Sequence, residues 1–165
     1  MIRALLPLSL ALLTAAPAHA EAKAEGTFSD WTVYTRDVSG DRICYALATP
    51  AQKTPSSVTH GDVYFMVANW KSGAATEQPS LLAGYPLKAK SVPKARVGST
   101  RVNMYSADNE AFVEAGTDET KLVNAMRKGA VMRVEAVSQR GTATSYEFSL
   151  KGVTAALRKA RSLCG

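Results

Sequence analysis

The chain is poor in the side chains that bind metals and activate nucleophiles. It holds two cysteines and two histidines in 165 residues. A zinc site would need two ligands beyond both cysteines, and only His60 lies outside the N-terminal segment. His60 sits in TPSSVTHGD, a run rich in Ser and Thr without periodicity, so we interpret it as a solvated loop residue. The sequence therefore predicts no metal and no cofactor.

Motifs of known enzymes are also missing. There is no G-x-S-x-G elbow, no glycine-rich phosphate loop and no calcium loop. The carboxylates of Asp118 and Glu119 are explained by the start of a helix, where acidic side chains suit the helix dipole. A serine near His60 is the one nucleophilic arrangement left to consider. We therefore expect a protein that is not an enzyme.

No apolar run is long enough to span a membrane. The longest, Ala4–Ala15, follows the basic Arg3 and precedes Ala18-His19-Ala20, a small-x-small cleavage site. This order is typical of a secretory signal peptide, here residues 1–20, and a membrane anchor is the less favoured alternative. We expect a flexible leader over residues 21–26 and a single β-sandwich domain over residues 27–165.

Short segments of alternating polarity, separated by turn residues about every ten positions, fill most of the mature chain. They favour an antiparallel β-sandwich, because no strand-helix-strand alternation or repeat appears. The segment 62–70 is apolar on both faces, which predicts a deeply buried central strand. The predicted strands are residues 28–36, 43–49, 62–70, 80–85, 100–106, 111–115, 130–138 and 143–150.

Two short helices interrupt this pattern, at about 117–128 and 153–164. Thr117 is the expected N-cap of the first helix and Gly129 its stop. In the second, the apolar residues recur on one stripe that ends at Cys164. The fold class is thus mainly β, an immunoglobulin-like antiparallel sandwich with two short helices.

The two cysteines predict one disulfide, Cys44–Cys164. Cys44 lies in the strand 43–49 and Cys164 on the apolar side of the last helix, with no third thiol to compete. An exported protein meets an oxidising compartment, where such a pair forms a bond. Two free thiols are the alternative.

The charge of the chain is basic, at +6. Arg3 is the only charged residue of the first twenty, so the mature chain carries +6 − 1 = +5. One stretch is basic without an acidic neighbour: Lys88, Lys90, Lys94, Arg96 and Arg101. It predicts either an anion-binding surface or a solvated loop that keeps the protein soluble. Export argues against nucleic acid as the partner. Anionic envelope material and a protein remain as the candidate partners.

The ordered series of segments resembles the invasion-associated locus B family of exported alphaproteobacterial proteins. The similarity runs from DWTVYTRD through VYFMVANWK, GYPLK and FVEAGTDETKLVNAMRKG to SYEFSLKGVTAAL and the last cysteine. Val153 stands where a phenylalanine is expected. The resemblance implies an immunoglobulin-like sandwich, a periplasmic or outer-membrane-associated location, and no catalytic residues. A non-enzymatic envelope protein is the favoured function, with a cell-wall hydrolase or lysozyme-inhibitor-like protein as the alternative.

Export should remove residues 1–20, so that the mature protein begins at Glu21. N-terminal sequencing of protein from a periplasmic extract checks this prediction. A mature product that still begins at Met1 would contradict both the export hypothesis and the compartment argument for the disulfide.

Overall fold

Eleven strands and two helices make up residues 21–165, the part of the chain that the computed structural model describes. The predicted signal peptide, residues 1–20, lies outside this part. The elements are β1 (Lys23–Phe28), β2 (Trp31–Val38), β3 (Asp41–Ala48), β4 (Gln52–Thr54), β5 (Tyr64–Trp70), β6 (Gln78–Leu82), β7 (Lys94–Val97), β8 (Thr100–Ala107), β9 (Glu110–Val113), α1 (Thr117–Lys128), β10 (Val131–Val137), β11 (Ala143–Ser149) and α2 (Val153–Cys164).

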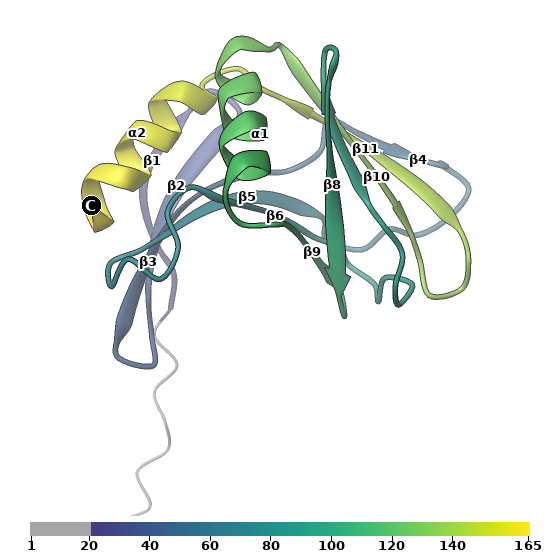
Figure 1. The fold of residues 1–165 in the computed structure, drawn as a ribbon, viewed down its shortest axis with the longest axis horizontal. Helices are drawn as coiled ribbons and strands as arrows, with labels where there is room; N and C mark the ends of the chain where they lie inside the picture. Colours follow the sequence, from purple (N-terminus) through teal and green to yellow (C-terminus); the bar gives the residue numbers. More distant parts are fainter. Residues whose placement is uncertain (1–20) are drawn as a thin grey trace, which may run out of the picture.

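The strands form one continuous sheet in the order β1-β2-β3-β5-β6-β9-β8-β7-β10-β11-β4, and every pair is antiparallel. β8 joins two halves of this sheet. Its residues 100–103 pair with β7, whereas its residues 104–107 pair with β9. The sheet bends along β8 (Figure 1). The second half, formed by β7, β10, β11 and β4, therefore turns towards the first half, which contains β2, β3, β5, β6 and β9. The predicted mainly β, antiparallel fold is confirmed.

The core lies between the two halves of the sheet. The rings of Phe65 on β5 and Phe148 on β11 are 5.6 Å apart, and both side chains are fully buried. The indole N–H of Trp31 on β2 donates a hydrogen bond of 2.9 Å to the carbonyl oxygen of Ser149 on β11. Apolar side chains of both halves thus face each other, a layering consistent with an immunoglobulin-like sandwich.

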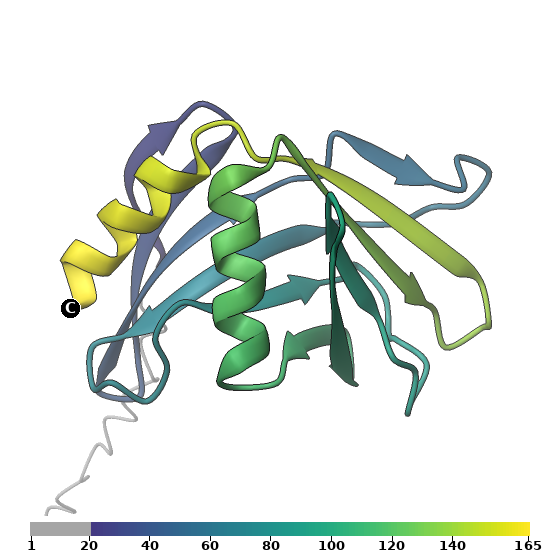
Figure 2. The ribbon, with the colours of Figure 1, turned by 45° about the horizontal axis from the view of Figure 1, so that its top comes forward.

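Both helices cover the inner face of the sheet where its second half does not reach. α2 lies against β1, β2, β3 and β5, and α1 lies between α2 and the strands β6, β7 and β8 (Figures 1 and 2). The predicted stripe of α2 is buried: Val153, Ala156, Leu157, Ala160 and Cys164. Neither helix is long and apolar enough to cross a membrane.

The helix starts show where glycine matters. α1 begins at Thr117, so the N-cap is Gly116 rather than the expected Thr117, and the carboxylate of Glu119 accepts the N–H of Gly116 at 3.1 Å. Gly152 precedes α2 with φ of 88°, and a Cβ there would lie 1.9 Å from the carbonyl oxygen of Phe28. Only glycine permits this turn beside β1, because L side chains disfavour positive φ.

Three strands escape the sequence prediction. The prediction of a flexible leader over residues 21–26 is wrong for residues 23–26, because β1 begins at Lys23 and pairs with β2. β4 lies between the predicted strands 43–49 and 62–70, where no strand was expected, and pairs with β11. β7 occupies part of the basic stretch, where exposed Lys94 and Arg96 alternate with buried Ala95 and Val97.

The expectation that the segment 62–70 is deeply buried holds for one of its faces only. Phe65, Val67 and Asn69 point into the core. On the other face, Tyr64, Met66, Ala68 and Trp70 are half-buried, because no described element covers it.

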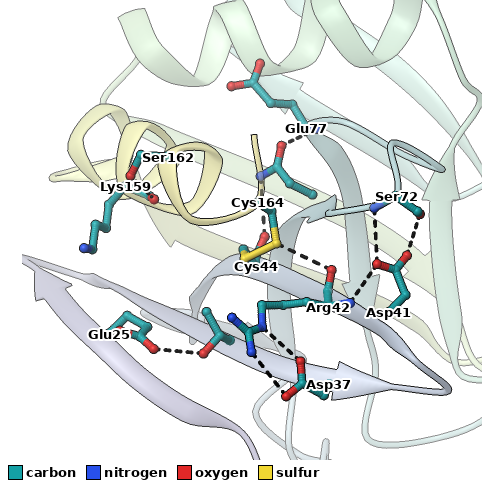
Figure 3. Close-up of a disulfide and its surroundings, with 12 residues drawn as sticks. Glu25, Asp37, Asp41, Arg42, Cys44, Ser72, Glu77, Lys159, Ser162 and Cys164 are labelled. Carbon is teal, nitrogen blue, oxygen red and sulfur yellow. Dashed lines mark hydrogen bonds and ion pairs between the residues drawn. A yellow bond between two sulfur atoms is a disulfide. The ribbon is translucent and has the colours of Figure 1, made fainter.

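A disulfide joins Cys44 on β3 to Cys164 at the end of α2, as the sequence predicts, with Cα atoms 5.8 Å apart and a sequence separation of 120 residues. Figure 3 shows the bond between the helix and the strand, beside Arg42, whose carbonyl oxygen lies 3.5 Å from Cys164 Sγ. Cys44 is fully buried and Cys164 nearly so. The bond therefore fixes α2 against the inner face of β3.

Replacing both cysteines by alanine should lower the midpoint of thermal unfolding by about 10–15 °C. A closed loop of this length contributes up to about 4–5 kcal/mol in the chain-entropy model, and about 3 °C is lost per kcal/mol in a domain of this size. Calorimetry of both proteins with and without reductant checks the prediction. Reductant should lower the unfolding midpoint of the wild-type protein but not that of the alanine variant. An unchanged midpoint in the reduced wild type would contradict the prediction.

Candidate functional site

A row of three arginines crosses the outer face of the second half of the sheet. Arg101 on β8 lies opposite Arg96 on β7, which lies opposite Arg133 on β10. All three side chains are exposed, because the inward positions of these strands carry the apolar residues. We call these three residues the arginine row. Neighbouring strands are about 4.8 Å apart, so the row spans about 10 Å.

The five residues of the predicted basic stretch fall into two groups. Lys94, Arg96 and Arg101 share the outer face of β7 and β8, with Lys94 two residues along β7 from Arg96. Lys88 and Lys90 are exposed in the connection before β7, where the backbone N–H of Lys88 donates to the carbonyl oxygen of Val137 at 2.9 Å.

Arg133 was not among the predicted site residues. The sequence predicts a strand over 130–138, and the alternation of MRVEA places Arg133 outward. The missing information was the pairing of β7 with β10, which joins residues more than thirty positions apart. Sequence alternation alone does not identify the neighbouring strand.

The arginine row is an electrostatically unfavourable arrangement. Like charges directly opposite each other on neighbouring strands destabilise a sheet. Arg133 is relieved by an ion pair with Glu147 on β11. Arg96 and Arg101 have no carboxylate within ion-pair distance among residues 21–165. Two neighbouring guanidinium groups are therefore available to an external anion.

A shallow hollow of about 450 Å³ borders this face. Lys94 and Glu135 line it together with the exposed Val92 and residues of β11. Lys94 lies directly opposite Glu135, so its charge is partly balanced. On this face, Arg96 and Arg101 thus have neither an ion-pair partner among residues 21–165 nor a carboxylate directly opposite.

The interpretation of His60 as a solvated loop residue is wrong, since its side chain is buried. Its Nε2 lies 2.8 Å from the carbonyl oxygen of Pro55, and its Nδ1 lies 2.9 Å from the hydroxyl oxygen of Tyr146. The Tyr146 hydroxyl lies 2.6 Å from that of Tyr85, which in turn lies 2.7 Å from the Thr144 hydroxyl. This series of hydrogen bonds lies beside a surface hollow of about 540 Å³, whose lining includes His60, Tyr85 and Thr144.

These hydrogen bonds occupy both ring nitrogens of His60. A carbonyl oxygen only accepts, so Nε2 carries a hydrogen, and in the neutral ring Nδ1 accepts the hydrogen of Tyr146. Burial raises the pKa of the Tyr146 hydroxyl far above its ordinary value, and the hydrogen bond with Tyr85 adds to this. Tyr146 therefore stays protonated, and His60 fixes the loop to the core instead of activating a serine.

The fold and these surfaces define the class of the protein. It is an antiparallel β-sandwich with two helices on its inner face, one of which is joined to β3 by a disulfide, and with the arginine row on its outer face. The chain belongs to the invasion associated locus B (IalB) protein family, whose model matches residues 31–161. The resemblance stated from the sequence is thereby confirmed. No curated protein gave a significant match, and neither did any solved structure.

Replacing Tyr146 by phenylalanine should destabilise the protein by about 1–3 kcal/mol, because His60 and Tyr85 each lose a buried partner. Urea unfolding of the purified protein measures this loss. Tyr34→Phe on the outer face of β2 is the matched control, and its effect should stay within about 0.5 kcal/mol. Equal stability of the two variants would contradict a structural role for the His60 chain.

Proposed function

We propose that the protein acts without catalysis at the bacterial cell envelope, in the periplasm or at the outer membrane, by binding anionic envelope material through the arginine row. The observation that carries the proposal is the pair of exposed guanidinium groups of Arg96 and Arg101 on adjacent strands, neither of which forms an ion pair within residues 21–165. Membership of the IalB family supports it, as does the signal peptide expected from the sequence.

The chemistry of the row suits phosphate and carboxylate groups. A guanidinium group is planar and can donate two parallel hydrogen bonds to either anion. Because adjacent strands hold the backbones of these arginines, their Cα atoms are about 5 Å apart before the ligand arrives. A polyanion with closely spaced charges, such as an acidic polysaccharide or a surface of phosphorylated lipids, can contact several members of the row at once.

The alternative of a cell-wall hydrolase loses its main support. Support for that hypothesis would have been a pocket in which His60 lies beside both a carboxylate and a serine. Both ring nitrogens of His60 are instead occupied by Pro55 and Tyr146. Surface binding is consequently the better supported function.

The triple variant Arg96→Gln, Arg101→Gln, Arg133→Gln should bind phosphatidylglycerol vesicles about 100-fold more weakly than the wild type. Each basic residue near an anionic surface contributes about 1 kcal/mol. Co-sedimentation at low ionic strength measures the difference. The charge-matched control Lys151→Gln, Arg158→Gln, Arg161→Gln changes three exposed residues of another surface and should bind nearly as the wild type.

The salt dependence provides the second part of this test. Binding by exposed charges should fall steeply up to physiological ionic strength, where the Debye length is about 8 Å. Equal losses in the two triple variants would assign binding to net charge and refute the arginine row. Binding that does not depend on salt would refute the electrostatic proposal altogether.

A further inference from the structure

The first half of the sheet has an outer face that is apolar and uncovered by any element of residues 21–165. It is built from the residues of β2, β3, β5, β6 and β9 whose side chains point away from the core. The register places them in neighbouring rows: Arg36, Ile43 and Trp70; Tyr34, Tyr45, Ala68 and Gln78; Leu47, Met66, Ser80 and Phe112; Tyr64, Leu82 and Glu110. We call this surface the apolar face.

The apolar face is hollowed along its middle. A groove of about 460 Å³ extends from Arg36 and Val38 on β2 to Glu110 and Phe112 on β9. Ala68 and Ser80 lie near its centre, where their small side chains leave space between larger ones. The larger apolar side chains around them, such as Tyr45, Met66 and Phe112, are half-buried and keep part of their surface in solvent.

The two ends of the groove carry opposite charges. Arg36 is exposed at the β2 end, and Glu110 is half-buried at the β9 end. Neither makes an ion pair with another described residue. Glu110 offers no positive partner to an anion, and as a carboxylate it would repel one placed beside it. The charges therefore give the groove a direction, with the site for an anionic group at Arg36.

The groove is long enough for an extended hydrocarbon chain. Four strand spacings separate β2 from β9, about 19 Å. A long-chain hydrocarbon laid across this distance would place its apolar surface against the apolar lining residues.

We propose that the apolar face binds a free long-chain fatty acid, with its carboxylate at Arg36 and its hydrocarbon chain in the groove over Ala68 and Ser80 towards Phe112. Arg36, which forms no ion pair within residues 21–165, supplies a guanidinium group for the carboxylate. The aromatic and aliphatic walls remove the chain from water. This site is independent of the arginine row, which lies on the other half of the sheet, so either proposal can fail alone.

The two tryptophans make the test direct. Trp70 lines the groove, whereas Trp31 is fully buried in the core. Dibromostearate, in which bromine quenches nearby indole emission, should produce a saturable loss of fluorescence in the wild type. The loss should disappear in Trp70→Phe. In the wild type, unbrominated stearate should displace dibromostearate and restore the fluorescence. Saturable quenching that persists in Trp70→Phe, or no quenching at all, would overturn the proposal.

Two further variants separate the chain from the head group. Ala68→Leu fills the groove and should weaken stearate binding at least about tenfold, whereas Ala143→Leu on exposed β11 should not. Arg36→Gln should weaken binding of stearate but not of stearyl alcohol, which lacks the carboxylate. Circular dichroism establishes that each variant is folded. Equal affinity of Arg36→Gln and the wild type for stearate would refute the assigned direction.

Light scattering distinguishes the remaining occupant, a second copy of this chain. The proposal expects the same mass with and without stearate, and in Ala68→Leu. A dimer that Ala68→Leu dissociates, together with no quenching by dibromostearate, would assign the apolar face to self-association and overturn the proposal.

Discussion

The structure depends on one constraint, that a single eleven-stranded sheet must bury its inner face against itself. β8 makes this possible by pairing with β9 along one part of its length and with β7 along the other. The contact of Phe65 with Phe148 and the hydrogen bond from Trp31 to Ser149 then hold the two halves together. The remaining inner surface is covered by α1 and α2, and the Cys44–Cys164 bond fixes α2 there.

This arrangement leaves two outer faces with different chemistry. On the half formed by β7, β8 and β10, inward positions are apolar and many outward positions are charged, as in an ordinary solvated sheet. On the half formed by β2, β3, β5, β6 and β9, both sides are apolar, although only the inner side is covered within residues 21–165. The charged face suits a polyanion, and the apolar face suits a hydrocarbon chain. Both assignments follow from which side of a strand each residue occupies.

Much of the fold could be predicted from the sequence, because it is encoded in local periodicity. The change from alternation to a helical stripe at Gly152, and the stripe that ends at Cys164, identified α2 and its cysteine. Other features depend on pairing between distant segments. The three short strands β1, β4 and β7 form because a neighbour offers hydrogen bonds, and Arg133 meets Arg96 only through the pairing of β10 with β7. His60 appeared loop-like because its contact with Tyr146 joins residues 86 positions apart. The apolar outer side of β5 looked like a second buried face, since a sequence does not show whether another layer covers it.

The central claim is that the two outer faces are separate binding surfaces, and nuclear magnetic resonance of one labelled sample tests it most directly. Backbone amide shifts would be followed first with an oligosaccharide bearing several carboxylates and then with stearate. The account predicts that the oligosaccharide moves the signals of Arg96, Arg101 and Arg133, and that stearate moves those of Tyr45, Ala68 and Trp70. Both ligands shifting the same set of residues, or shifts centred on α2, would contradict it.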